Sequence, residues 1–502
     1  MKILFFFLTL ITFSAFAQKT VNTANGKVEG TEKHGLRIFK GIPFATPPIG
    51  DLRWKAPQAV KNWTGILKCT EFSASPMQIL TSPITYWTEE FLLKPEPPSE
   101  DCLYLNIWTT VKKEKQPVFV WIYGGAFQNG SANCAIFDGE EMAKKGVVFV
   151  SINYRVGVLG FMAHPELTKE SGYNASGNYG FLDQMEALRW IQKNIAAFGG
   201  DPNNVTIAGQ SAGAVSVCAL VASPLAKGLF HKAIAQSGGL LSNFKRSNLE
   251  ESEQKGMKFM QKIGVHSIEE LRNKSAVELQ NLSGTTFVNS SCLDGYFLPT
   301  NVMQHFEKGL HNDVPLLTGW TSDDGAIREI APITLENYKN EAKTNFGDKA
   351  DAFLSIFLAQ TDEEAFALKT KLAMFQSRAL PSHLLAGFNK KSKSYVYQFS
   401  HVPPDKPNFP NYGAFHSYEV PYALHTLKKW LRPWQQTDWD LEDKMASYWV
   451  NFAKTGNPNG KGLPEWKAYN KETGNTMEFG DNVILKKAAF KKELDFLEMV
   501  WK

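Results

Sequence analysis

The chain has 502 residues, of which 43% are hydrophobic and 21% are charged. This is the composition of an ordinary globular protein, which excludes a disordered or fibrous chain. The formal net charge is only +4, and no run of Lys and Arg interrupts the sequence. Nucleic acid is therefore not expected as a partner.

The N-terminus has the pattern of an export signal. Met1 and Lys2 precede an uncharged apolar stretch over residues 3–16, and Ala15-Phe16-Ala17 forms a small-x-small cleavage site. We expect a signal peptide over residues 1–17 and a mature chain that begins near Gln18. The alternative is a membrane anchor, but the apolar stretch is shorter than the roughly 18 residues that a membrane span needs. The sequence thus predicts a secreted or periplasmic protein without a stable membrane anchor.

Three short apolar runs predict buried parallel strands, at residues 117–123, 147–152 and 205–208. Residues 180–198, between the last two runs, carry apolar side chains at steps of three and four, as an amphipathic helix does. Strand, helix and strand in this order predict a mostly parallel sheet with helices on both faces.

The rest of the chain predicts additions to this sheet and no second domain. Strand-like segments recur at 314–318, 395–400 and 476–485. Residues 247–282 and 335–379 are polar-rich and mostly helical, and we expect them as insertions packed over one end of the sheet. Because the composition does not change along the chain, residues 18–502 are expected to form one domain.

A candidate nucleophile follows the third predicted strand. Residues 205–208 lead directly into Gly209-Gln-Ser-Ala-Gly213 and then into an apolar helix. This is a G-x-S-x-G pattern between a strand and a helix, the context in which the serine stands on a sharp turn. Glycine is needed on either side because larger side chains would meet the neighbouring backbone. The pattern predicts Ser211 as a nucleophile at a helix N-terminus, where negative charge is favoured.

Residues 204–213 resemble the active-serine signature of the type-B carboxylesterases, the family that includes the cholinesterases. Residues 100–108 (EDCLYLNIW) resemble the second signature of that family, and residues 121–127 and 153–157 are also similar to it. Within this family, the sequence most resembles the bacterial para-nitrobenzyl-esterase-like carboxylesterases. The resemblance runs from about Gly26 to the C-terminus. It implies an α/β-hydrolase fold with helical insertions over the active site.

The same resemblance implies an oxyanion hole. Small residues at a strand end let backbone N–H groups approach an alkoxide, and Gly124-Gly125-Ala126 directly follow the first predicted strand. By resemblance, the N–H groups of Gly125 and Ala126 act together with that of Ala212.

The resemblance also implies a base and an acid, in the chain order serine, acid, histidine. Residues 411–419 resemble the family's catalytic-histidine loop and place His416 as the base. The family usually shows Asp-Glu-Gly after the preceding strand, whereas this chain has Asp323-Asp324-Gly325. Asp324 thus takes the place of the acid with a side chain one methylene shorter. Asp323 is expected to support the loop or to face a different polar group.

Five cysteines occur, an odd number in a chain that we expect to be exported. By resemblance, Cys69 and Cys102 form a disulfide. Cys134, Cys218 and Cys292 are then left unpaired, with Cys218 buried in the helix after the nucleophile.

Two ion pairs and one aromatic pair complete the expectations from the sequence. By resemblance, the ion pairs are structural and join Arg53 to Glu100 and Arg155 to Asp183. Tyr86 and Trp87 could line the substrate entrance, although packing is an equal alternative.

The sequence therefore predicts a carboxylic-ester hydrolase that acts on a small-molecule ester through a Ser-His-Asp triad and an acyl-enzyme. No metal or organic cofactor is expected. A lipase or another acyl-transfer hydrolase on the same machinery is the alternative, followed by a non-catalytic relative. Neither the natural substrate nor the oligomeric state is readable from the sequence.

Overall fold

The structure is a computed structural model that describes residues 19–80, 89–92, 97–110, 115–241, 246–284, 291–324, 331–406 and 411–501. The expected signal peptide, the aromatic pair Tyr86 and Trp87, and Gly325 lie outside these residues. Their roles stay predictions.

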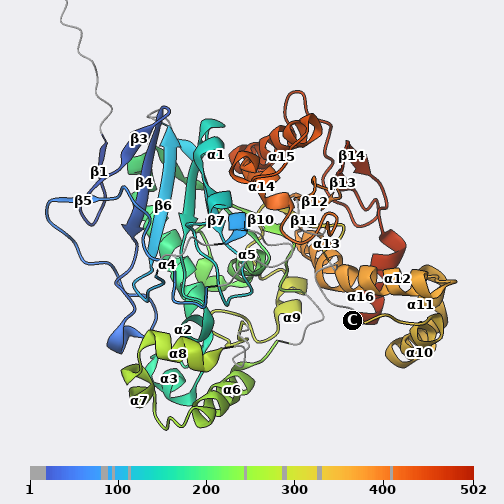
Figure 1. Cartoon of the computed structure of the whole chain (residues 1–502), viewed down its shortest axis with the longest axis horizontal. Helices are drawn as coiled ribbons and strands as arrows, with labels where there is room; N and C mark the ends of the chain where they lie inside the picture. Colours follow the sequence, from blue (N-terminus) through green and yellow to red (C-terminus); the bar gives the residue numbers. More distant parts are fainter. Residues whose placement is uncertain are drawn as a thin grey trace, which may run out of the picture.

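In the described ranges, eleven strands form one large mixed sheet (Figure 1). The strands from β8 to β13 run parallel, and antiparallel strands flank them at both edges. In order across the sheet they are β14 (Val483–Lys486), β13 (Thr476–Phe479), β12 (Ser394–Phe399), β11 (Leu316–Thr321), β10 (Lys232–Gln236), β9 (Gly200–Gln210), β7 (Gln116–Ile122), β8 (Val148–Ile152), β6 (Tyr104–Thr110), β4 (Leu36–Pro43) and β3 (Thr31–Lys33). A small separate sheet contains β1 (Thr20–Asn22), β2 (Lys27–Glu29) and β5 (Ile66–Lys68).

Helices cover both faces of the large sheet, as the apolar runs predict. Side chains of a strand alternate between its two faces, and β7 shows the result. Its Val118, Val120 and Ile122 belong to one hydrophobic core, whereas Phe119 and Trp121 belong to another. Helices α4 and α5 contribute to the first core and α14 and α15 to the second.

The α-helices of the described ranges are α1 (Glu140–Lys144), α2 (Gly157–Phe161), α3 (Pro165–Glu170), α4 (Tyr179–Asn194), α5 (Ala212–Ala222), α6 (Leu249–Lys262), α7 (Ile268–Asn273), α8 (Ala276–Ser283), α9 (Val302–Glu307), α10 (Leu335–Phe346), α11 (Ala350–Ile356), α12 (Asp362–Met374), α13 (Leu380–Phe388), α14 (Glu419–Leu424), α15 (Gln436–Thr455) and α16 (Lys491–Trp501). None of these helices combines the length and apolar character that crossing a bilayer requires.

The two helical insertions form two groups of helices that lie apart from each other. Figure 1 shows α6 to α8 beside α2 and α3, and α10 to α12 beside α16. Both groups contribute buried apolar side chains to one hydrophobic core, Phe259 and Leu271 in the first group and Phe353 and Met374 in the second. The segment expected as a strand near residues 476–485 is also different: it is an antiparallel hairpin of β13 and β14.

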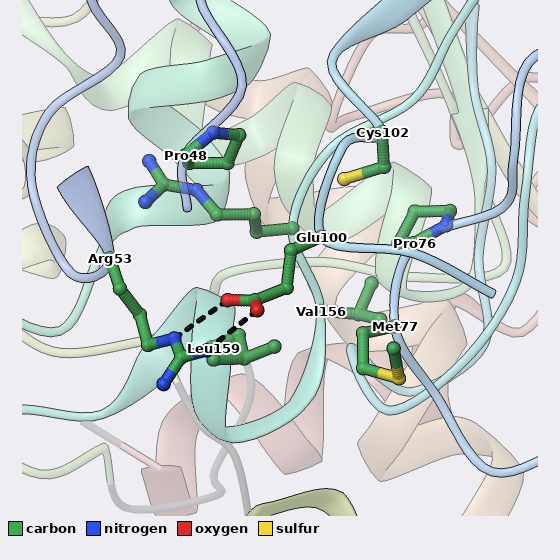
Figure 2. A pocket seen from close by; sticks show the side chains of 9 residues that line it. Pro48, Arg53, Pro76, Met77, Glu100, Cys102, Val156 and Leu159 are labelled. Carbon is green, nitrogen blue, oxygen red and sulfur yellow. Dashed lines mark hydrogen bonds and ion pairs between the residues drawn. The ribbon is translucent and has the colours of Figure 1, made fainter. Parts of the chain in front are cut away.

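The residues of the two expected ion pairs are in contact; Arg53, Arg155 and Asp183 are buried and Glu100 is partly buried. Arg53 donates from Nε and Nη2 to the two carboxylate oxygens of Glu100 at 2.7 and 2.6 Å (Figure 2). Arg155 does the same with Asp183, at 2.8 and 2.7 Å. Two parallel hydrogen bonds between a guanidinium and a carboxylate fix their relative orientation. Both pairs therefore hold loops near the sheet in defined positions.

The expected Cys69–Cys102 disulfide is absent: both residues are buried free thiols, as are the other three cysteines. The backbone segments that carry the two residues meet β4 at different points. The carbonyl of Cys69 accepts from Lys40 N, whereas the carbonyl of Leu103, next to Cys102, accepts from Phe44 N. The two segments thus meet β4 at points four residues apart, on either side of an irregularity in its register, and the two thiols stay separate.

Candidate active site

Ser211 stands on the turn between β9 and α5, in a backbone conformation that non-glycine residues seldom adopt. Its φ is 58° and its ψ −124°. A Cβ atom on Gly213 would lie 2.1 Å from the carbonyl oxygen of Ile122 in β7, and one on Gly209 would lie 2.6 Å from the Gly213 carbonyl. Both flanking positions must therefore be glycine, because the turn is pressed against the neighbouring strand.

His416 connects Ser211 to Asp324. Its Nε2 lies 2.8 Å from Ser211 Oγ, and its Nδ1 lies 2.6 Å from Asp324 Oδ1. Asp324 follows β11 and His416 precedes α14, so two segments that are 92 residues apart meet the turn after β9. His416 and Asp324 are both buried. The three side chains form a continuous hydrogen-bonded chain.

Asp323 holds the histidine loop and does not contact the imidazole. Its Oδ2 accepts from Ala414 N at 2.8 Å and from Ser322 Oγ at 2.9 Å. Gly413 has a φ of +72°, and a Cβ atom there would lie 2.5 Å from Asp323 Oδ2. The two neighbouring aspartates thus have separate partners: Asp323 binds the backbone of the loop and Asp324 binds the ring.

Arg378 is a second partner of Asp324. It extends from a π-helical turn, Phe375–Ala379, and its Nε lies 3.1 Å from Asp324 Oδ1. Burial by itself would raise the pKa of Asp324, but the charges of His416 and Arg378 outweigh it and hold the pKa well below its usual value. The carboxylate is therefore ionised at neutral pH. No local signal in the sequence connects Arg378 to this site.

The three residues expected to form an oxyanion hole surround Ser211. Gly125 and Ala126 line the same pocket as Ser211, and both have positive φ values, 115° and 54°. Ala212 is the first residue of α5. A Cβ atom on Gly124 would lie 3.0 Å from Ser211 Cβ, so the backbone of this loop passes directly beside the nucleophile.

A pocket of about 540 Å³ opens over Ser211. Its wall is largely apolar, and among the described residues no charged side chain lines it. The apolar part consists of Ile79, Leu80, Phe91, Leu92, Cys134, Ile136, Phe137 and Val420, and the polar side chains are Gln128, Asn129, Ser131, Gln210, Ser211 and Ser417. These residues come from several loops, so sequence patterns did not bring them together.

Glu419 is a buried carboxyl group near Asp324. It begins α14, three residues after His416, and its Oε1 accepts from Ser237 Oγ at 3.0 Å. Burial raises the pKa of Glu419 to about 8, and the negative charge of Asp324 acts in the same direction. At neutral pH, Glu419 is therefore a neutral acid next to the ionised Asp324.

Comparison with known proteins agrees with this geometry. The model of the carboxylesterase family matches residues 17–497. The fumonisin B1 esterase of Sphingopyxis macrogoltabida is 36% identical over 92% of this chain and 86% of its own length. The para-nitrobenzyl esterase of Bacillus subtilis is 32% identical over 93% of this chain and 95% of its own length. The solved structure of a thermophilic para-nitrobenzyl esterase has a TM-score of 0.81 at 30% identity, covering 95% of this chain and 99% of that one.

The fold is the α/β-hydrolase fold, in which a large sheet carries its nucleophile at the carboxyl edge of a central strand. The chain belongs to the carboxylesterase family and is a serine carboxylesterase, a hydrolase of carboxylic esters.

Replacing Glu419 by Gln should make stability less dependent on pH. The folded-state pKa of Glu419 is about 8, above the ~4.3 of an unperturbed glutamate, so the folded protein keeps a proton that the unfolded chain releases. The retained proton on Glu419 stabilises the folded protein fully below about pH 4, and this stabilisation is lost as the pH rises through about 8. Because Gln cannot ionise, the Tm of Glu419→Gln relative to the wild type should rise between pH 5 and 9. A difference that stays constant over this range would contradict the assignment.

Proposed function

We propose that Ser211, His416 and Asp324 act as a catalytic triad that hydrolyses esters through an acyl-enzyme. The observation that carries the proposal is the unbroken chain of hydrogen bonds from Ser211 Oγ through both ring nitrogens of His416 to Asp324. In the tautomer that donates from Nδ1 to Asp324, Nε2 is free to accept the serine proton.

In the first half of the reaction, Ser211 Oγ attacks the carbonyl carbon of the ester while its proton moves to His416 Nε2. The ionised Asp324 accepts from Nδ1–H and stabilises the imidazolium that forms. The carbonyl oxygen becomes an alkoxide. The backbone N–H groups of Gly125, Ala126 and Ala212 are proposed to donate to it, and each such donor contributes about 3 kcal/mol in a comparable site.

In the second half, the alkoxide collapses and the bond to the leaving oxygen breaks. That oxygen takes the proton from His416 Nε2 and departs as an alcohol. A water molecule then attacks the acyl carbon and gives a proton to His416. A second collapse releases the carboxylic acid, and the proton returns to Ser211. All protons in this cycle move through one ring nitrogen.

The pocket supports an ester with uncharged groups around the reacting carbonyl. Burying a charge without a partner costs several kcal/mol, and the described lining residues offer no charged partner. The relatives named above act on chemically different esters, so their names do not define the substrate of this chain. A panel of esters that varies acyl length, alcohol size and charge would define it and would separate a lipase from a carboxylesterase.

Replacing Ser211 by Ala should leave a folded protein without esterase activity. The change removes one hydroxyl and leaves the packing around it unchanged, so Tm should hardly move. The kcat should fall about 10⁵–10⁶-fold. Hydrolysis of a soluble short-chain ester and a thermal melt measure the two effects. Near-wild-type activity in Ser211→Ala would refute the proposed triad.

The neighbouring aspartates should respond differently to the same substitution. Asn at position 324 loses the charge that stabilises the imidazolium and favours the wrong tautomer, so kcat should fall about 10³–10⁴-fold. Asn at position 323 can still accept from Ala414 N, and its kcat should stay within about tenfold of the wild type. Asp323→Asn is thus the matched control. A larger loss in Asp323→Asn would mean that the triad acid is assigned to the wrong residue.

A further inference from the structure

Gln210, the last residue of β9, extends into the pocket beside the nucleophile. Its amide nitrogen lies 3.4 Å from Nδ1 of His416 and 3.3 Å from Nε2. Its amide oxygen accepts from Ser417 Oγ at 3.1 Å. The side chain is buried, and the triad mechanism leaves it without a role.

The amide nitrogen lies against the face of the imidazole ring. Both ring nitrogens already have partners, Asp324 at Nδ1 and Ser211 at Nε2, and these bonds occupy the plane of the ring. The amide nitrogen of Gln210 is almost equally distant from the two ring nitrogens, at 3.4 and 3.3 Å. If it lay in the plane of the ring at these distances, it would overlap other atoms of the ring. The contact is therefore an N–H group directed at the π-face, a weak but directional interaction.

We propose that Gln210, held by Ser417, is a positioning residue that fixes the plane of the His416 ring. This inference rests on the proposed function of His416 as the base. Without the contact, rotation about the side-chain bonds would turn one ring nitrogen away from Ser211 or Asp324. The amide closes the pocket side of the ring and leaves the in-plane bonds intact.

Ser417 gives the amide a defined orientation. It follows His416 directly and has a φ of 84°, a conformation that favours glycine. In this conformation its hydroxyl reaches back to Gln210 Oε1, so that the amide nitrogen is the end that faces the ring. The histidine loop thus carries both the imidazole and the group that orients its neighbour.

Electrostatics favours an amide over a carboxylate at this position. The partial positive charge of an N–H group is attracted to the face of a neutral ring but repelled by an imidazolium. Of the charged and titratable groups around the ring, Asp324 faces Nδ1 in the ring plane, and Arg378 and the neutral Glu419 lie beyond Asp324. A carboxylate at position 210 would add a negative charge at the open face and stabilise the protonated ring.

The test compares four purified variants with the wild type in the hydrolysis of para-nitrophenyl butyrate across pH. In Gln210→Met, which keeps the size but loses the amide, kcat should fall roughly two- to fivefold, with KM almost unchanged. In Gln210→Glu, the acid limb of the kcat/KM profile should move up by about one pH unit. Ser417→Ala should reproduce part of the Gln210→Met loss, and the double variant should lose less than the product of the two.

Gln184→Met is the matched control, because Gln184 is an equally buried amide that donates to Ser216 Oγ outside the pocket. It should keep the wild-type pH profile. The inference is overturned if Gln210→Met keeps the wild-type kcat, or if KM rises while kcat is unchanged, which would make Gln210 a substrate contact. If Gln210→Glu does not fold, the Met and Ser417 variants decide. Activity in Ser211→Ala would instead refute the triad itself, so the two failures are distinct.

Discussion

The close approach of the β9–α5 turn to β7 is the constraint on which the site depends. Two glycines let the Ser211 backbone pass within contact distance of the Ile122 carbonyl, and the turn then places the serine in a strained conformation. Such conformations cost about 1–3 kcal/mol. The cores on both faces of β7 and β9 hold the turn in place. The strain lifts the hydroxyl above the sheet edge, where the loops after β7 and β11 and the loop before α14 can reach it.

Three carboxyl groups lie near His416, and each of them has different partners. Asp324 is buried but stays ionised, because a histidine and an arginine contact it. Glu419 is equally buried, has a serine hydroxyl as a partner and keeps its proton at neutral pH. Asp323 binds backbone N–H of the histidine loop. A carboxyl group near His416 can stabilise an imidazolium only if it is ionised, and a neighbouring positive charge decides whether a buried carboxyl group is ionised.

Local patterns predicted the parts of the site that depend on backbone geometry. The glycines around Ser211 and the strand before them are consecutive in the chain, so the turn could be recognised without a structure. His416 and Asp324 were assigned through a family resemblance, since nothing local distinguishes a loop histidine that meets a distant serine.

Other features could not be predicted because they depend on contacts between distant segments. Strand β10, Lys-Ala-Ile-Ala-Gln, is short and poor in branched residues, yet it is fully buried between β9 and β11. Arg378 reaches Asp324 from a π-helical turn 54 residues away. The disulfide that the resemblance implied is absent for a related reason: the segments that carry Cys69 and Cys102 meet β4 at separate points.

The most direct test of the central claim is the site and rate of covalent labelling by a fluorophosphonate, which reacts with an activated serine. After incubation and digestion, mass spectrometry should find one phosphonyl group on Ser211. The labelling rate should fall at least about 10³-fold in His416→Ala, because the serine then lacks its base. Labelling at another residue, or an unchanged rate in His416→Ala, would contradict the account of Ser211 as a nucleophile activated by His416.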